Sequence, residues 1–233
     1  MTISLVKGQR VNLEKGGGLK LSRFCVGISW SGVETEFKKR GILGFGAKTI
    51  TETKYASLDL SCVMYNKNGK LTDHIYSPLY EPELLFRYGL PEGKLVSDKG
   101  ALEHIDNKMR EAKTEAKTWD NEVFSVDLSK IDNDITNIVF FLNSTGEEDF
   151  SKIGLTKVRL HEGTPDTIGN VHAEYKILGR PQDRGKRAMV LGEFYKKNEV
   201  WRFNAIGDVF EDACFADTIQ RLNSCHSSGN AAK

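Results

Sequence analysis

The chain has 233 residues, of which 39% are hydrophobic, and its formal net charge is +1. This length and composition predict one globular domain that can bury a core without disulfide staples. Because Lys and Arg are matched by Asp and Glu and form no basic stripe, nucleic acid is excluded as an expected partner. No apolar run approaches the roughly 18 residues of a membrane-spanning helix, so we expect no direct membrane insertion.

The cysteines also indicate a cellular compartment. There are four, without CxxC spacing, and Cys25 and Cys62 fall inside apolar runs where a thiol packs as a small hydrophobe. We therefore expect reduced thiols and a cytoplasmic protein.

Apolar residues alternate with polar ones over much of the chain, which is typical of strands. In residues 23–30 (RFCVGISW) and 57–66 (SLDLSCVMYN) every second residue is apolar. Further strand candidates are EVFSVDL, NIVFFLN, GLTKVRLHE, VHAEYKIL, AMVLGEFYK and VWRFNAIG. Such short strands separated by turns predict a mainly β protein, a two-sheet antiparallel β-sandwich.

Two segments between these strands lack the alternation. Residues 41–50 (GILGFGAKTI) hold glycines and a Lys-Thr pair, but Ala47 separates Gly46 from Lys48, so we expect a mobile glycine-rich loop and no phosphate loop. Residues 78–94 form an insertion rich in apolar and aromatic side chains. It is either a lid over the core or a surface for a partner, and we expect Leu84, Leu85 and Phe86 to pack inward as a lid.

Helical spacing is found twice. Between residues 101 and 117, apolar residues recur three or four apart, which predicts a helix inserted among the strands. Residues 212–222 predict a short closing helix. We therefore expect one domain over residues 1–223, with insertions at about 78–94 and 101–117, followed by a flexible tail over residues 224–233.

No catalytic constellation is present in the sequence. The five histidines show neither HExxH nor another paired ligand spacing, and there is no Gly-x-Ser-x-Gly elbow. No cysteine lies in a nucleophile signature. We expect a non-enzymatic protein.

An acidic cluster stands at the mouth of one predicted strand, in TWDNEVFSVDL (residues 118–128). Asp and Asn favour turns where a strand begins, so the cluster is explained by a solvated turn. It is explained equally by a cation site, because Ca²⁺ takes several oxygen ligands from loops.

Several segments together resemble the TerD family of tellurium-resistance proteins. They are DLS at Asp59, SDKGALEHIDN (97–107) and WDNEVFSVDL, in the family's order. The resemblance spans nearly the whole chain, including ISLVKGQRVNL, VGISW, NIVFFLN and AMVLGEFYKKNEVWRFNAIGD. It implies a two-sheet sandwich that binds Ca²⁺ and has no established enzymatic activity.

Carried over residue by residue, the resemblance implies metal ligands at Asp59, Asp106, Asn107, Asp120, Asn121 and Glu122. The set is degenerate, because Ser57, Ile105 and Asn121 depart from the family's pattern, and calcium affinity falls as ligand charge is lost. If the predicted helix begins early enough to include Asp106 and Asn107, these two face solvent instead.

Three functional hypotheses follow. The first is a calcium-binding stress-response protein of the tellurite-resistance type, which assembles inside the cell with other tellurium-resistance proteins and reaches a membrane only through another subunit. The second is an accessory interaction module of the same system that has lost calcium. The third, a metal-dependent hydrolase using Asp106, Asp120 and Glu122, ranks last because no general base or nucleophile can be named.

Overall fold

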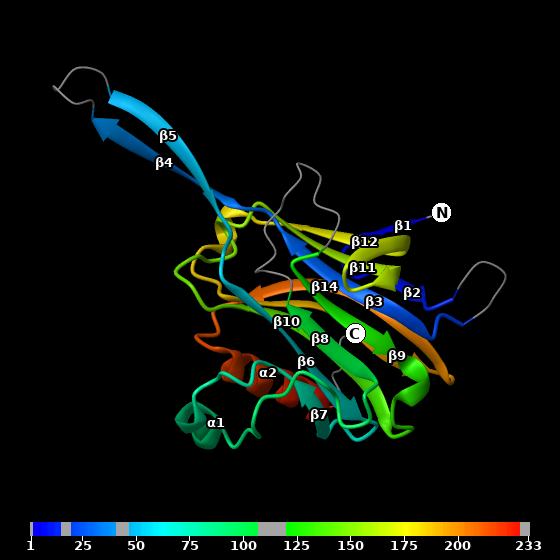
Figure 1. Ribbon diagram of the computed structural model, residues 1–233. Coiled ribbons are helices and arrows are strands. Elements are labelled where there is room, and N and C mark those ends of the chain that lie inside the picture. The colour runs from blue at the N-terminus through cyan, green and yellow to red at the C-terminus, as the bar shows by residue number, and fades with distance from the viewer. Residues whose placement is uncertain (1, 15–19, 41–46, 107–119, 229–233) are drawn as a thin grey trace.

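In the described part of the chain, two six-stranded β-sheets pack face to face as a sandwich (Figure 1). The computed structural model describes residues 2–14, 20–40, 47–106 and 120–228. Strand β1 runs parallel to β12, and the other neighbouring strands are antiparallel. The predicted mainly β, antiparallel sandwich is confirmed.

The strand order fixes which residues meet. The first sheet consists of β1 (Ile3–Leu5), β12 (Thr167–Leu178), β11 (Leu155–Thr164), β3 (Arg23–Trp30), β9 (Glu122–Asp127) and β8 (Leu102–Asp106), in this spatial order. The second consists of β2 (Arg10–Asn12), β14 (Val200–Phe210), β13 (Ala188–Lys197), β10 (Ile135–Ser144), β6 (Leu58–Asn66) and β7 (Leu71–Ile75).

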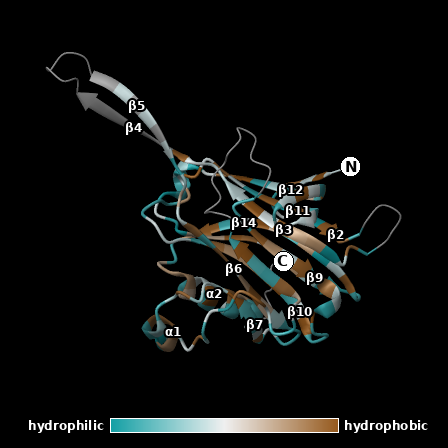
Figure 2. Cartoon of the chain, viewed as in Figure 1, coloured by the Kyte–Doolittle hydropathy of each residue, from teal (hydrophilic) through white to brown (hydrophobic). Residues whose placement is uncertain are grey.

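The core between the sheets is built from the inward-facing residues of the alternating strands. Five phenylalanines form an edge-to-face chain through it, with ring centroids 5.2–5.4 Å apart: Phe24 and Phe124 from the first sheet, and Phe140, Phe194 and Phe203 from the second. Figure 2 shows apolar residues concentrated on the strands of the sandwich. Because these rings come from both sheets, the two sheets share this core.

Two α-helices within the described residues cover the outer face of the second sheet. They are α1 (Pro82–Tyr88) and α2 (Phe215–Ser227), and Leu85, Phe215, Ile219 and Leu222 from them pack on Val63, Tyr65, Val139 and Phe141 of the sheet. Tyr80 stacks on Phe215 with ring centroids 3.7 Å apart. Strands β6 and β10 are therefore buried on both faces, which explains their nearly continuous apolar runs.

The helix predicted over residues 101–117 is wrong where the structure describes it. Leu102–Asp106 forms β8, in which Leu102 pairs with Val126 and Ile105 with Val123 of β9. Pairing with a neighbouring strand has overridden the three-residue spacing of Leu102 and Ile105. Residues 107–117 lie outside the described residues. The inserted helix of the structure is α1, in the other insertion.

The helix α1 begins and ends at the residues that helix chemistry favours. Pro82 stands at its first turn, where the missing N–H costs nothing, and Gly89 ends it in the left-handed conformation, φ 63°. The predicted closing helix is confirmed as α2, although it begins at Phe215 and runs to Ser227, into the segment predicted as a flexible tail. Residues 229–233 are not described.

A hairpin that sequence analysis missed projects from the sandwich (Figure 1). Its strands are β4 (Val33–Arg40) and β5 (Ala47–Lys54). Residues 47–50, predicted as part of a glycine-rich loop, belong to β5, and residues 41–46 lie outside the described residues. The strands VETEFKKR and AKTITETK are mostly charged or Thr, so they lack the apolar alternation that reveals a half-buried strand.

Candidate functional site

The predicted acidic cluster lies where the chain enters β9, at one end of the first sheet. Asp120 and Asn121 precede the strand, and Glu122 is its first residue. All three are buried. Each binds a different part of the protein.

Asp120 lies on the outer face of the first sheet. Its Oδ1 is ion-paired with the guanidinium of Arg159 on β11, and its Oδ2 is 3.8 Å from Nε2 of His161. A Cβ on Gly27 would come within 1.9 Å of Oδ2, so Asp120 fills the space left by that glycine. A protein cation thus balances the Asp120 charge.

The pKa values of two basic residues near Asp120 are lowered. Burial lowers the pKa of the Arg159 guanidinium, against the opposing effect of Glu174, yet an arginine remains charged at neutral pH. Burial also lowers the pKa of His161, and the nearby Arg159 and His172 lower it further. The Nδ1 of neutral His161 donates to the carbonyl of Glu162, 3.1 Å away. The cationic partner of Asp120 is therefore Arg159.

Glu122 points between the two sheets. Its Oε2 accepts a hydrogen bond from the backbone N–H of Leu60, 2.9 Å away on β6 of the second sheet. The same oxygen lies 2.8 Å from Nε2 of His104 on β8. Glu122 therefore joins the two sheets and its neighbouring strand at this end of the sandwich.

Asn121 and Asp59 occupy two further places. The Oδ1 of Asn121 accepts a hydrogen bond from the backbone N–H of Trp30, 3.2 Å away at the end of β3. The hydroxyl of Tyr80 donates to Oδ2 of Asp59, 3.2 Å away. Burial, together with the charges of Asp59 and Glu122, raises the pKa of Tyr80.

The remaining predicted ligands lie at the end of β8. Asp106 is exposed and is the register partner of Glu122. Asn107 lies outside the described residues. Within the described ranges, no three His, Cys, Asp or Glu side chains are arranged to hold a metal ion.

Residues two apart in a strand point the same way, but Asp120 and Glu122 do not. The strand begins only at Glu122, and the two carboxylates contact Arg159 and His104 respectively. Sequence reasoning missed these basic partners and Gly27. Alternation in GLTKVRLHE places Arg159 on the outer face, but nothing in the sequence says which strand lies beside it.

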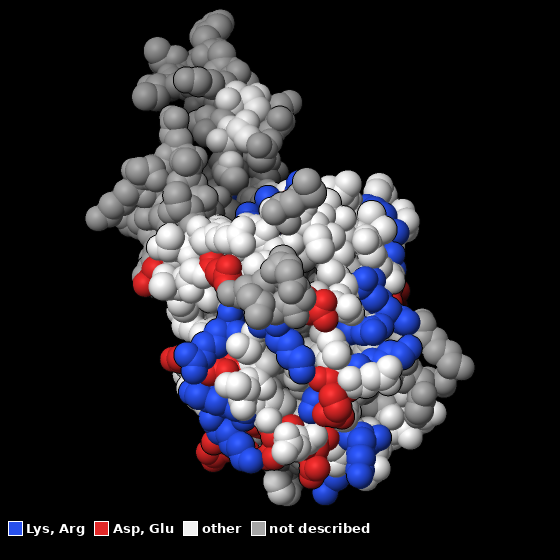
Figure 3. Space-filling model, turned by 90° about the vertical axis from the view of Figure 1, so that its right-hand side faces the viewer, with Lys and Arg blue, Asp and Glu red and all other residues white. Residues whose placement is uncertain are grey.

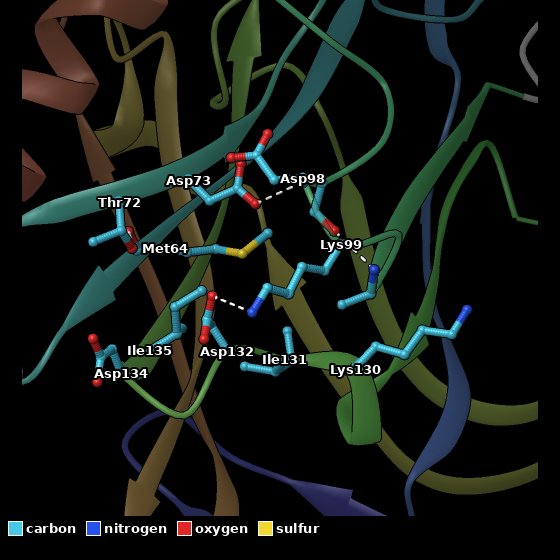
Figure 4. A pocket seen from close by; sticks show the side chains of 12 residues that line it. Met64, Thr72, Asp73, Asp98, Lys99, Lys130, Ile131, Asp132, Asp134 and Ile135 are labelled. Atoms are coloured by element: carbon cyan, nitrogen blue, oxygen red, sulfur yellow. Dashed lines mark hydrogen bonds and ion pairs between the residues drawn. The ribbon is translucent and has the colours of Figure 1, made fainter.

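A second polar site, at the opposite end of β6, was also missed. A cavity of about 150 Å³ is lined by Met64 and by the turns around residues 97–101 and 130–135 (Figure 4). In its wall, buried Asp73 accepts hydrogen bonds from the N–H groups of His74 (2.8 Å) and Asp98 (3.0 Å) and pairs with Lys94 at 2.7 Å. These contacts tie the turns together, as does the 2.7 Å ion pair of Lys99 with Asp132.

One part of the insertion at residues 78–94 packs on the second sheet, and another part is exposed to solvent. Leu85 is buried and Leu84 packs partly against the same cluster, as the lid interpretation predicts. The inward packing predicted for Phe86 is wrong, because this side chain is 89% exposed. Leu79, in the preceding turn, is 88% exposed.

Charged side chains of both signs occur on the face of the molecule shown in Figure 3. Asp and Glu lie there among Lys and Arg, mainly on the lower half of that face. None of the described helices is long and apolar enough to cross a membrane.

These features define a two-sheet β-sandwich protein with buried acidic residues at one end of the sheets and a closing helix. The model of the TerD domain matches residues 1–221, so the chain belongs to the TerD domain family. This is a family of tellurium-resistance and stress-response proteins.

Relatives over nearly the full length carry names of both kinds. The chain is 28% identical to the stress response protein SCP2 of Bacillus subtilis, covering 95% of this chain and 99% of that protein. It is 29% identical to the tellurium resistance protein TerZ of Serratia marcescens, covering 95% of each. A solved Streptomyces coelicolor homologue of the telluride resistance protein TerD superposes over 91% of this chain and 99% of that chain, at 13% identity and a TM-score of 0.48.

Proposed function

We propose that this chain acts in stress response or tellurium resistance as a non-enzymatic interaction module whose partner is another TerD-domain protein. The observation that carries the proposal is the exposed apolar surface of the insertion, formed by Phe86 and Leu79. Large apolar side chains held in water by a helix and its adjoining turn are typical of contact surfaces. Charged neighbours such as Glu83 and Arg87 supply a polar rim.

A partner from the same family is supported by the relatives. Several proteins similar in sequence to this chain are named as tellurium resistance proteins, among them TerZ, TerD and TerA. We further propose an intracellular setting, which the four free cysteines support.

The acidic cluster supports a module that works without calcium. Ca²⁺ needs about six to eight oxygen ligands, with enough negative charge among them. Here Asp120 is engaged by Arg159, and Glu122 by His104 and the Leu60 N–H. Arg159 offsets the negative charge of Asp120, so less ligand charge is left for a cation, and this supports a module that works without calcium.

The experiment measures binding to each TerD-domain protein of the same genome with purified partners. Phe86→Ser with Leu79→Ser should weaken binding about tenfold or more, because exposed anchors contribute to association and little to folding. The melting temperature should stay unchanged. Leu178→Ser, at an apolar residue that is 65% exposed on β12, is the matched control and should bind normally. Unchanged binding by the double variant would refute the proposal.

Calcium binding is the second candidate, and one observation favours it. Asp106 and Glu122 are directly opposite in the β8–β9 register. The charges of Asp59 and Glu122 both raise the pKa of Tyr80. Acidic groups therefore gather at one end of the sandwich. A ligand that binds only the folded state raises the melting temperature by mass action. We expect chelator-treated protein to show no shift with Ca²⁺. A shift that is lost in Asp106→Asn would establish the second candidate instead.

A further inference from the structure

A cavity of about 200 Å³ lies between the last turns of α2 and the outer face of the second sheet. One of its apolar side chains comes from α2 and the others from β10, β13 and β14: Leu222, Val139, Val190, Ile206 and Phe210. Exposed Cys225 of α2 also lines the cavity, which therefore reaches the protein surface. An apolar cavity of about 150 Å³ can hold a molecule the size of benzene. This cavity is thus large enough for a small organic ligand.

A β-bulge forms part of the cavity wall. Two residues of β14, Ile206 and Gly207, stand opposite a single residue of β13, Leu191. Gly207 has the positive φ, 68°, that such a bulge favours, and Ile206 packs against the apolar cluster beneath α2. Bulges interrupt the regular ladder, re-aim side chains and are frequent beside functional sites. Here the bulge places Ile206 in the cavity wall.

The polar end of the cavity is formed by a buried carboxylate. Glu193 lines the cavity and is only 3% exposed. Its Oε1 accepts a hydrogen bond from Nδ2 of Asn137, 2.6 Å away, and lies 3.1 Å from Nε2 of His226. In the described part of the chain, no group donates to its other oxygen, Oε2, which keeps accessible surface. Oε2 can therefore accept a hydrogen bond from a molecule in the cavity.

The charges that line the cavity are balanced. Both ring nitrogens of His226 face acceptors, because Nδ1 lies 2.9 Å from the carbonyl oxygen of Leu222 and Nε2 faces Glu193. These two contacts need two protons, and with two protons between them His226 and Glu193 have no net charge. The other charged residues of the lining are paired with residues of opposite charge: Asp208 with Lys7, and Arg221 with Asp212. An ion in the cavity would therefore lose its water without gaining a counter-charge.

We propose that this cavity binds a small, neutral, largely apolar molecule with one hydrogen-bond donor, such as a phenol or an indole. Its ring packs against Leu222, Ile206 and Phe210, and its O–H or N–H donates to Oε2 of Glu193. Because these residues come from α2 and from the sheet, the ligand joins the two elements and stabilises the end of α2. The cavity is separate from the exposed apolar surface of the insertion, so binding here does not depend on the proposed function.

The test titrates the full chain with phenol and follows methyl resonances by NMR. The methyl groups of Ile206 and Leu222 should shift to saturation, whereas those of Leu85, buried beneath α1, should not. Toluene has nearly the same shape as phenol and is more apolar, but it lacks the donor, so it should bind about threefold more weakly or worse. Benzylammonium should also bind more weakly, because its charge finds no partner. Toluene or benzylammonium binding as tightly as phenol would overturn the proposal, as would the absence of a saturable shift.

Variants and thiol labelling place the ligand in the cavity. Ile206→Trp should fill the cavity and weaken phenol binding about tenfold or more. Gln220→Trp, at an exposed residue of α2 outside the cavity lining, is the matched control and should bind phenol normally.

The labelling experiment uses the wild type, so it does not depend on a variant that folds. Saturating phenol should slow the alkylation of Cys225 about threefold or more and leave that of Cys214 unchanged, because only Cys225 lines the cavity. Normal phenol binding by Ile206→Trp, or an unchanged rate at Cys225 under saturation, would overturn the proposal.

Discussion

Asp120 depends on two neighbours that lie far from it in the sequence. Gly27 leaves the space for its carboxylate, and Arg159 balances its charge. The three residues come from the entry to β9 and from β3 and β11, which are consecutive in the first sheet. Removing either neighbour should therefore disturb the same carboxylate.

Arg159→Leu should lower the free energy of unfolding by about 3–5 kcal/mol, because it leaves a buried carboxylate without its cation. Adding Asp120→Asn should recover much of the loss. Lys157→Leu is the control on the same strand, since its ion pair with Glu174 is long, at 3.6 Å, and should cost about 1 kcal/mol or less. Urea unfolding of the four proteins measures these differences. Equal losses at residues 157 and 159 would contradict the proposed pairing.

Gly27→Ala should cost about 1–3 kcal/mol, because the new methyl group must displace the Asp120 carboxylate. The loss should be far from additive with Arg159→Leu, since both changes break the same contact. Ser29→Ala, two residues along β3, should be nearly neutral. Additive losses in the double variant would show that Gly27 acts through something other than Asp120.

At the scale of elements, the Asp217 carboxylate stabilises the first turn of α2. Asp217 accepts hydrogen bonds from the N–H groups of Ala213 (3.1 Å) and Cys214 (3.2 Å), and from the Tyr88 hydroxyl at the end of α1 (2.7 Å). The hydrogen bond from Tyr88 and those from Cys214 and Ala213 lower the pKa of Asp217, outweighing its burial. This residue thus links the two helices that cover the second sheet.

Asp217→Asn should therefore destabilise the protein by about 1 kcal/mol near neutral pH, as the loss of a helix cap does. The folded-state pKa is below the unfolded value of about 3.9. The contribution is thus fully present above that value and is lost as pH falls through the folded pKa. Thermal unfolding from pH 7 down to pH 2 should show the difference between variant and wild type shrinking as the pH falls below about 3.9. A difference that persists there, or an equal effect of exposed Glu211→Gln, would contradict it.

The elements also show what the sequence could predict. Strands with one face in the core, such as RFCVGISW, were found from alternation, and the acidic cluster was correctly placed at the mouth of β9. Alternation failed for β4 and β5, which are mostly charged or Thr, and for β8, where Leu102 and Ile105 mimic a helix. The basic partners of the cluster could not be predicted. Arg159 and His104 lie near it because of the order of the strands in the sheet, which the sequence does not reveal.

At the scale of the whole molecule, the sheets share one core and should unfold together. The phenylalanine chain crosses between them, and Glu122 of the first sheet binds the backbone of Leu60 in the second. Opening one sheet would therefore expose the apolar face of the other. A domain built in this way behaves as one cooperative unit.

Cys62 reports on that unit, because it lies on β6 with no exposed surface, and burial raises the pKa of its thiol. A thiol reacts with alkylating reagents as the thiolate, so Cys62 should be modified only when the sandwich opens. We expect the free energy of opening derived from its labelling rate to equal the global free energy of unfolding at each urea concentration. Exposed Cys225 should react at once and serves as the reference, with mass spectrometry assigning each site. If the free energy of opening derived from Cys62 labelling were well below the global free energy of unfolding, the second sheet would open while the first stays folded.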